Sequence, residues 1–128
     1  MHILLVEDDE DDQDLIKYAF EQLNKGHTLQ IANNGQEAID YLSELPATGL
    51  PCLIILDLNM PVLDGIQTLE ALKGEDKYSG IPKVVFTTSD SPHYKEKSMN
   101  NGATDFMVKP SDMNTLVHSV EKMLGFCS

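Results

Sequence analysis

The sequence predicts one α/β domain, built on a parallel sheet that helices cover on both faces. Short apolar runs alternate five times with stretches whose apolar residues recur at helical spacing. The runs over 2–6 and 52–56 are almost entirely apolar, as in strands that are buried on both faces. The length of 128 residues suits one domain, so we expect residues 1–128 to form it, with no output domain attached.

The chain begins with an expected strand, a helix and a second strand. Residues 2–6 form the first strand. The helix that follows presents one apolar face, made of Leu15, Ile16, Ala19, Phe20 and Leu23. Residues 24–26 include a glycine, which is typical of a helix end. Residues 28–32 alternate between polar and apolar side chains, so we place this second strand nearer an edge of the sheet.

The middle of the chain carries the second helix, the third strand and the third helix. Asn34 and Glu37 have the spacing of a capping box, which marks the start of the second helix. After a loop, the third strand covers residues 52–56. Pro61 then ends the regular structure, and Asp64-Gly65 marks a turn into the third helix.

The last part of the chain contains two strands and two helices. The strands are expected over 84–86 and 106–108. Ser91-Pro92 suits the start of a helix over 93–101. Tyr94 and Met99 are the main large apolar residues of this helix, so we expect it to be more mobile than its neighbours. The final helix has a clear apolar face, made of Met113, Leu116, Val117, Val120 and Leu124.

The net charge of −12 at pH 7 restricts the partners of this chain. It argues against direct binding to nucleic acid or to an anionic membrane, because both are polyanions. It favours basic partners or a divalent cation, although general solubility explains part of it. No apolar stretch approaches the roughly 20 residues of a membrane span, and the N-terminus lacks the pattern of a signal peptide. We therefore expect a cytoplasmic protein.

The two cysteines, Cys52 and Cys127, lie far apart in the sequence and indicate no disulfide framework. We expect Cys52 to pack as a small core residue and Cys127 to lie in the tail. The four histidines lack the spacing of metal ligands, so we expect no zinc site.

An acidic run over residues 7–12 follows the first strand. Asp11 and Asp12 suit the positive N-terminal end of the next helix, which explains them without a functional role. Glu7 and Asp8 fall directly at the strand end, and helix capping does not account for them.

Chemically active side chains follow four of the five expected strands. Glu7 and Asp8 follow the first, and the others are Asp57, Thr87 and Lys109. Since the carboxyl ends of parallel strands lie along one edge, where open sheets bind ligands, we expect these side chains to meet. Each has an ordinary explanation alone, as a cap, a surface charge or a hydroxyl bonded to the backbone. Four such coincidences together are much harder to explain.

Three carboxylates at one edge form an oxygen site suited to Mg²⁺. A carboxylate beside this ion, together with a lysine and a hydroxyl, supplies the parts needed for phosphoryl transfer to an aspartate. Asp57 would then be the nucleophile. Lys109 and Mg²⁺ would offset the charge of the phosphoryl oxygens, and Thr87 would donate a hydrogen bond.

In their order and spacing, these motifs resemble the receiver domains of response regulators in two-component signalling, over nearly the whole chain. They are Leu5-Val6-Glu7-Asp8, Asp57-Leu58-Asn59-Met60-Pro61, Asp64-Gly65, Thr87, and Phe106 followed by Lys109-Pro110. The stretches 58–61 and 87–89 are most similar to small stand-alone receivers of the kind paired with phytochrome-type histidine kinases. The resemblance implies a flavodoxin-like (βα)5 fold, with a doubly wound sheet in the order 2-1-3-4-5.

The resemblance also implies a metal site and a phosphoacceptor. Asp57 is expected to accept the phosphoryl group. Asp8, Asp57 and the backbone carbonyl of Asn59 are expected to hold Mg²⁺, together with Glu7, which binds it directly or through water. Lys109 would pair with the phosphoryl group, and its bond to Pro110 is expected to be cis.

The resemblance further implies a switch and a set of residues that tune the phosphoryl lifetime. Thr87 and Phe106 are expected to move together on phosphorylation. Asn59, Thr88 and Ser89 occupy the tuning positions. Smaller residues are common where Thr88 stands, so we hypothesise that its methyl group narrows access to Asp57.

As a receiver, this chain would take its phosphoryl group from a sensor histidine kinase, of phytochrome type by the narrower resemblance. It would signal to a downstream protein or pass phosphate to a histidine phosphotransfer protein. The output surface would combine the helix over 93–101, the strand over 106–108 and the last helix, and the same surface could form a homodimer. The chain would be no enzyme beyond its own phosphorylation and dephosphorylation.

Two other classes remain open. A Mg²⁺-dependent phosphatase-like or nuclease-like enzyme would use the same acidic edge, and turnover of an external substrate would distinguish it. The chain lacks an insertion long enough to form a lid. A flavodoxin-like cofactor binder would need Gly, Ser or Thr in the first strand–helix loop, where this chain has six acids.

Overall fold

Five parallel strands form a single sheet in the order β2-β1-β3-β4-β5. The computed structural model describes residues 2–127. The strands are β1 (His2–Val6), β2 (Thr28–Ala32), β3 (Leu53–Leu56), β4 (Lys83–Thr87) and β5 (Asp105–Val108). The predicted fold class and strand order are confirmed, and the expected strand ranges are correct to within a residue at each end.

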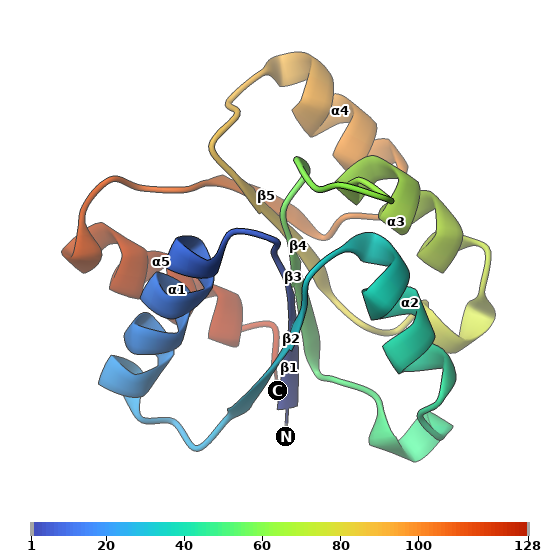
Figure 1. Cartoon of the computed structure of the whole chain (residues 1–128), viewed down its shortest axis with the longest axis horizontal. Helices are drawn as coiled ribbons and strands as arrows, with labels where there is room; N and C mark the ends of the chain where they lie inside the picture. The colour runs from blue at the N-terminus through green and yellow to red at the C-terminus, as the bar shows by residue number, and fades with distance from the viewer. Residues whose placement is uncertain (1, 128) are drawn as a thin grey trace.

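Helices cover both faces of this sheet (Figure 1). They are α1 (Glu10–Leu23), α2 (Gly35–Ser43), α3 (Gly65–Lys73), α4 (Pro92–Asn100) and α5 (Met113–Leu124), with short 3-10 turns η1 (Ala47–Gly49) and η2 (Asp76–Tyr78). α1 and α5 pack together against one face. α2 and α3 pack against the other, with α4 beside α3.

Each face of the sheet has its own apolar core, because successive residues of a strand point to opposite faces. Ile3 and Leu5 of β1 belong to the core under α1 and α5. Leu4 and Val6 belong to the core under α2 and α3. All four are at most 1% exposed. Burial on both faces explains why this run lacks the polar alternation of a half-exposed strand.

α1 begins and ends at residues with specific capping roles. The side chain of Asp9 accepts a hydrogen bond from the backbone N–H of Asp12. The helix ends at Asn24, whose φ of 48° lies in the left-handed region that asparagine tolerates. The predicted end of this helix is confirmed.

One residue of the predicted apolar face of α1 is misplaced. Leu15 is 46% exposed, whereas Gln13 is buried. The Nε2 group of Gln13 donates hydrogen bonds to the backbone oxygen of Glu7 and to Oδ1 of Asn33. These bonds satisfy the amide inside the protein, so the helix can turn a polar side chain inward.

The predicted capping box at the start of α2 is only half formed. The side chain of Asn34 accepts a hydrogen bond from the backbone N–H of Glu37 at 2.9 Å. The carboxylate of Glu37 accepts instead from the backbone N–H of Asn33. A complete capping box occurs at α3, between Asp64 and Gln67.

α4 is weakly anchored, as its sequence predicts. Tyr94 and Met99 are 45% and 41% exposed, and the buried residue of this helix is Ser98. Pro92 occupies the first turn and Ser91 the N-cap position, although the Ser91 side chain makes no capping hydrogen bond.

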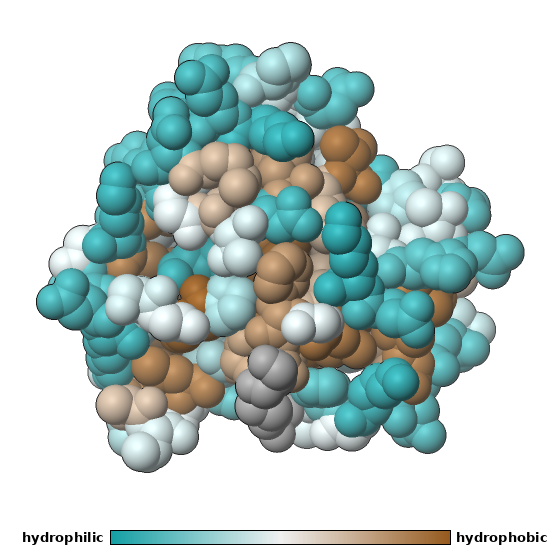
Figure 2. Space-filling model, turned by 180° about the vertical axis from the view of Figure 1, so that it is seen from behind, coloured by the Kyte–Doolittle hydropathy of each residue, from teal (hydrophilic) through white to brown (hydrophobic). Residues whose placement is uncertain are grey.

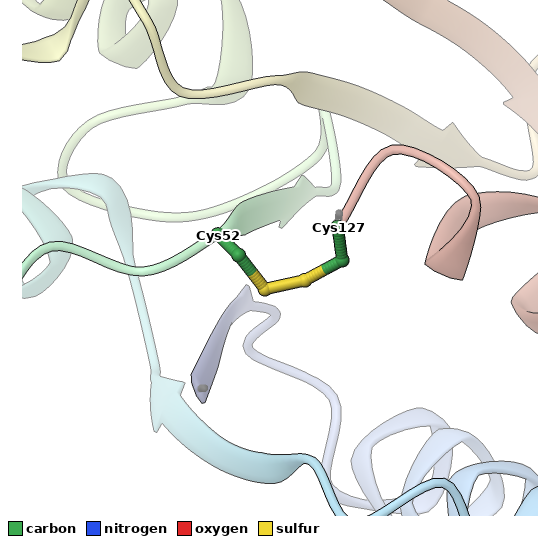
Figure 3. The surroundings of a disulfide bond; sticks show 2 residues. All are labelled: Cys52 and Cys127. Carbon is green, nitrogen blue, oxygen red and sulfur yellow. A yellow bond between two sulfur atoms is a disulfide. The ribbon is translucent and has the colours of Figure 1, made fainter.

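Cys52 and Cys127 form a disulfide bond, contrary to the prediction (Figure 3). Their Cα atoms lie 5.0 Å apart, although 75 residues separate them in the sequence. The chain turns back after α5, which brings Cys127 to the start of β3 beside Cys52. Sequence separation carries no information on this return, so the prediction was wrong.

The surface is mostly hydrophilic around the rim of the molecule, with hydrophobic residues gathered near the middle of the face seen in Figure 2. None of the helices formed by the described residues is long and apolar enough to cross a membrane.

Candidate functional site

The carboxyl ends of β1 and β3 bring three acidic side chains together. Val6 pairs with Leu56 across the two strands, so the residues that follow, Glu7 and Asp57, leave the sheet side by side. The backbone N–H of Asp57 donates to the oxygen of Val6 at 3.1 Å. One carboxylate oxygen from each of Glu7, Asp8 and Asp57 lies within 4.8 Å of the other two. The structure thus gathers the acids that the sequence placed at this edge.

Lys109 follows β5 and reaches two of these acids, Glu7 and Asp57, as well as Asp12. Its Nζ lies 2.5 Å from Oε1 of Glu7, 2.8 Å from Oδ2 of Asp12 and 3.4 Å from Oδ2 of Asp57. The Lys109 side chain is only 10% exposed, so its ion pairs with the buried Glu7 and Asp57 are largely shielded from solvent, whereas its pair with Asp12 is partly screened. The lysine therefore lies between the candidate phosphoacceptor and two other carboxylates.

The peptide bond between Lys109 and Pro110 is trans, as are all peptide bonds of the described residues. The expected cis bond was therefore wrong. The trans isomer is the ordinary preference of an X–Pro bond.

Burial and charge shift the pKa of two groups in this site. Burial raises the pKa of Glu7 to about 7, and the negative charge of Asp57 adds to the shift, while the hydrogen bond from Lys109 opposes it. Burial alone would lower the pKa of Lys109, but hydrogen bonds to Asp12 and Glu7 and the charge of Asp57 raise it. Lys109 is therefore a permanent cation beside Asp57, and Glu7 exchanges a proton near neutral pH.

Asp12 is part of the site, although the sequence predicted only a helix-capping role for it. Its carboxylate accepts a hydrogen bond from Lys109, and its backbone N–H is capped by Asp9. Asp12 lies in the first turn of α1, where the helix carries its side chain back toward the end of β5. The single available signal was its place in the acidic run. Asp11, the other acid explained by capping, is exposed.

Thr87 ends β4 and is fully buried. Its backbone oxygen accepts a hydrogen bond from the N–H of Lys109 at 2.7 Å, so β4 and β5 hold these two residues in register. The Thr87 hydroxyl oxygen lies 3.4 Å from the backbone nitrogen of Ser89, a long hydrogen bond that leaves the hydroxyl proton free to donate elsewhere.

Phe106 lies in the middle of β5 and is half-buried. It packs against the core under α2 and α3, opposite its strand partner Val85. A ring in this position has partial access to solvent and can change its packing without opening the core.

Of the three residues expected to tune the phosphoryl lifetime, Asn59 contacts the acidic cluster. The backbone N–H of Asn59 lies 3.5 Å from Oδ1 of Asp57. Asn59 and Thr88 are exposed, and Ser89 is half-buried. Thr88 and Ser89 directly follow Thr87 at the end of β4, and their tuning role stays a prediction.

The loop after Asp57 is held close to the strand by Gly65. The backbone N–H of Gly65 donates to the oxygen of Leu58 at 3.1 Å. A Cβ atom at this position would lie 2.5 Å from the backbone oxygen of Asp57 and 2.7 Å from Cα of Leu58. The close approach requires glycine, which explains the Asp-Gly motif. In the same loop, Val62 has a φ of 69°, an unfavourable conformation for a β-branched residue.

This arrangement suits a specific kind of chemistry. Three clustered carboxylates offer the oxygen ligands of a hard divalent cation. A fixed ammonium group lies beside one of them, and a buried hydroxyl ends the neighbouring strand. A nucleophilic carboxylate flanked by cationic and hydrogen-bonding groups can accept a group that carries negative charge, such as a phosphoryl group.

The sequence matches one protein family over most of its length. A family model described as the response regulator receiver domain covers residues 3–121. The probable methanogenesis regulatory protein FilR2 of Methanothrix harundinacea (strain 6Ac) is 34% identical over 123 residues, which cover 94% of this chain and 79% of that protein. Transcriptional regulatory protein TrcR of Mycobacterium tuberculosis is 29% identical over 97% of this chain, but the match covers only 45% of TrcR.

Solved structures match the fold as well. The Mn²⁺-bound form of response regulator Rcp1 superimposes with a TM-score of 0.84 at 30% identity, covering 98% of this chain and 92% of that chain. The phosphorylated cyanobacterial phytochrome response regulator RcpA gives a TM-score of 0.88 at 29% identity, with the same coverage. The bacteriophytochrome response regulator AtBRR gives 0.78 at 32% identity, covering 95% of this chain and 91% of that chain.

Proposed function

Because the chain belongs to the response regulator receiver domain family, the phosphoacceptor modules of two-component signalling, we propose that Asp57 is its phosphoacceptor. The family membership confirms the resemblance seen in the sequence motifs. The observation that best supports Asp57 is its position within 3.4 Å of Lys109 Nζ, in a cluster with Glu7 and Asp8.

In the proposed reaction, a carboxylate oxygen of Asp57 attacks the phosphorus of a phosphohistidine on the kinase. The new O–P bond forms as the P–N bond breaks, and the imidazole leaves with the electron pair. Lys109 is protonated throughout because its pKa is raised, so it offsets the charge of the transferred group. The hydroxyl of Thr87 donates a hydrogen bond to a phosphoryl oxygen.

The carboxylates of Glu7, Asp8 and Asp57 fit a hard divalent cation, because carboxylate oxygens at this spacing are the ligands such an ion prefers. We propose Mg²⁺, with the backbone carbonyl of Asn59 as a further ligand. A bound divalent cation supplies positive charge that offsets the phosphoryl oxygens. Glu7 has to lose its proton before it can bind the cation, so its raised pKa couples cation binding to pH.

The proposed signal passes from Thr87 and Phe106 to the surface formed by α4, β5 and α5. Three exposed apolar residues, Tyr94, Met99 and Val108, lie on α4 and β5. The weak packing of α4 supports this proposal, since a switching element has to be loosely held. The same surface is the proposed site of homodimerisation and of partner binding.

We propose that the donor is a cytoplasmic sensor histidine kinase of phytochrome type, supported by the similarity to RcpA and AtBRR. The receiver would act as a single domain over residues 1–128. It would pass its signal to a downstream protein or a histidine phosphotransfer protein, and it would turn over no external substrate.

Intact mass spectrometry after incubation with acetyl phosphate tests this proposal. We expect one added phosphoryl group in the presence of Mg²⁺ and none with EDTA. The Asp57→Asn variant should gain none, because its amide is a poor nucleophile. Asp64→Asn is the matched control, since Asp64 is also an aspartate near this loop but caps α3.

Two results would contradict the proposal. One is a phosphoryl group on Asp57→Asn at the wild-type level, which would place the acceptor elsewhere. The other is equal incorporation with Mg²⁺ and with EDTA, which would remove the role of the cation. Beryllium fluoride, a mimic of the aspartyl phosphate, provides a second test by NMR: it should shift signals of Thr87 and Phe106 in the wild type but not in Asp57→Asn.

A further inference from the structure

A second group of potential metal ligands lies at the opposite edge of the sheet from Asp57. His27 immediately precedes β2 and Cys52 immediately precedes β3, so both lie where the parallel strands begin. Cys127 joins them from the turn after α5. One donor atom from each of these three residues lies within 4.8 Å of the other two.

His27 carries an unsatisfied polar atom at this position. Among residues 2–127, its Nδ1 is the one buried side-chain nitrogen or oxygen without a hydrogen-bond partner. Burying such an atom without a hydrogen-bond partner costs free energy. An unpaired buried nitrogen beside two sulfur atoms therefore favours the binding of a ligand. A metal ion is the kind of ligand that the nitrogen and both sulfur atoms can bind together.

We propose that the reduced form of the protein binds one Zn²⁺ through His27 Nδ1 and the thiolates of Cys52 and Cys127. Two thiolates and an imidazole are the donors that Zn²⁺ prefers, and three protein ligands leave a fourth tetrahedral position for water. Mg²⁺ prefers carboxylate oxygens, so it would not compete with Zn²⁺ for this site, where the three residues offer no oxygen ligand.

The three donors are close enough to reach the spacing that this ion requires once the disulfide is reduced. Zn–S bonds of about 2.3 Å and Zn–N bonds of about 2.0 Å in a tetrahedral site separate the ligand atoms by roughly 3.5–3.8 Å. The present separations lie within 4.8 Å. Reduction breaks the bond between the two sulfur atoms, and the proposal requires Cys127, in the short segment after α5, to move away from Cys52 toward this spacing.

Solvent can also reach this group. A cavity of about 300 Å³ at the end of α1 is lined in part by Asn24, His27 and Leu124. His27 and Cys52 are both partly exposed, whereas Cys127 is buried. The cavity borders His27 and neither cysteine, so a metal ion would approach the cluster from the His27 side.

The disulfide and the zinc site exclude each other, because the same two sulfur atoms form both. A phosphine reductant supplies two electrons to the disulfide and takes the oxygen of one water molecule. The two thiols keep the protons of that water. Zn²⁺ then displaces both thiol protons, and neutral His27 contributes the lone pair of Nδ1 while Nε2 keeps its proton.

Cobalt is the probe for the test, because Co²⁺ bound tetrahedrally by thiolates gives a charge-transfer band and intense visible bands. The full chain is reduced with a phosphine and titrated with Co²⁺ in excess Mg²⁺, which keeps the carboxylate cluster around Asp57 occupied. We expect one equivalent of Co²⁺ to produce these bands and Zn²⁺ to abolish them. The oxidised protein should show neither the charge-transfer band nor the intense visible bands.

Variants identify the ligands. His27→Ala should weaken Zn²⁺ binding by about 100-fold or more, since even the hydrogen-bond partners of metal ligands contribute about 10–100-fold. Cys52→Ser and Cys127→Ser should each remove the charge-transfer band or reduce it to that of a single thiolate. His118→Ala, an exposed histidine on α5, should bind as the wild type does. Circular dichroism checks that each variant is folded.

The proposal is overturned if the reduced wild type shows no thiolate-to-cobalt band at stoichiometric Co²⁺. It is also overturned if His27→Ala retains the wild-type affinity for Zn²⁺, measured by loss of the cobalt bands. A thiol reagent gives an independent measurement: Zn²⁺ should protect both cysteines of the wild type, and the same free Zn²⁺ concentration should fail to protect those of His27→Ala.

Discussion

Lys109 Nζ lies 2.8 Å from Oδ2 of Asp12, although the two residues are 97 positions apart in the chain. The bond ties the first turn of α1 to the end of β5, on the far side of the sheet centre from β1. It also gives the lysine a partner other than Asp57, so the ammonium group is held at the site before any phosphoryl group arrives.

We expect Asp12→Asn to lower the free energy of unfolding by about 1 kcal/mol, because it removes a charge-assisted hydrogen bond that solvent partly screens. Urea denaturation in EDTA measures the change. Asp11→Asn removes the same charge from the same turn of the helix, but Asp11 has no ion pair with Lys109. This substitution should therefore lower the free energy of unfolding by less. Equal effects of the two substitutions would show that the Lys109 contact adds nothing.

Gly65→Ala should destabilise the protein by about 2–3 kcal/mol, because the new Cβ would overlap the backbone of Asp57 and Leu58. It should also slow phosphorylation by displacing Asp57. Gly80→Ala is the control, since a Cβ there meets nothing within 4 Å, and it should be neutral or stabilise by about 0.5 kcal/mol. Thermal unfolding and acetyl phosphate kinetics measure both effects, and a wild-type Tm for Gly65→Ala would refute this account.

Glu7 should make the stability of the metal-free protein depend on pH. Its pKa rises from 4.5 in the unfolded chain to about 7 in the fold, so the protonated form is the one that folding favours. The stabilising contribution is full below about pH 4.5 and is lost as the pH rises through about 7. Glu7→Gln lacks this titration. The free energy of unfolding of the wild type minus that of the variant should therefore fall by on the order of 3 kcal/mol between these two pH values. Urea denaturation in EDTA at several pH values tests this, and a difference independent of pH would contradict it.

Thr88→Ala should take up the phosphoryl group from acetyl phosphate faster, or hydrolyse it faster, because the lost methyl group widens the approach to Asp57. If the methyl group raises the activation barrier by about 1 kcal/mol, its removal should change the rate by about fivefold. Thr115→Ala, the same substitution at an exposed site of α5, should leave both rates unchanged. Unchanged rates for Thr88→Ala would refute the idea.

Val62→Asn should raise the free energy of unfolding by about 1 kcal/mol, because asparagine tolerates the positive φ that valine resists. Val62 is 79% exposed, so the substitution sacrifices little packing. Val108→Asn is the matched control: Val108 is 45% exposed in β5, where asparagine should destabilise. A loss of stability in Val62→Asn would contradict the prediction.

The order of elements, the sheet and most of the acidic edge could be predicted from the sequence. Buried strands such as β1 and β3 are recognisable because burial on both faces selects an unbroken apolar run. Glu7, Asp8, Asp57, Thr87 and Lys109 could be placed together because each lies at or just after the end of a strand, and parallel strands align their carboxyl ends. These inferences use only local pattern and the geometry of a parallel sheet.

The tertiary structure alone decided which groups pair. Asp12 reaches Lys109 because the fold places the first turn of α1 beside the end of β5, and Gln13 is buried because Glu7 and Asn33 offer it hydrogen bonds. Cys127 meets Cys52 because the chain turns back after α5. Contacts between residues far apart in sequence depend on how helices pack and where loops return, and neither periodicity nor spacing along the chain encodes that geometry.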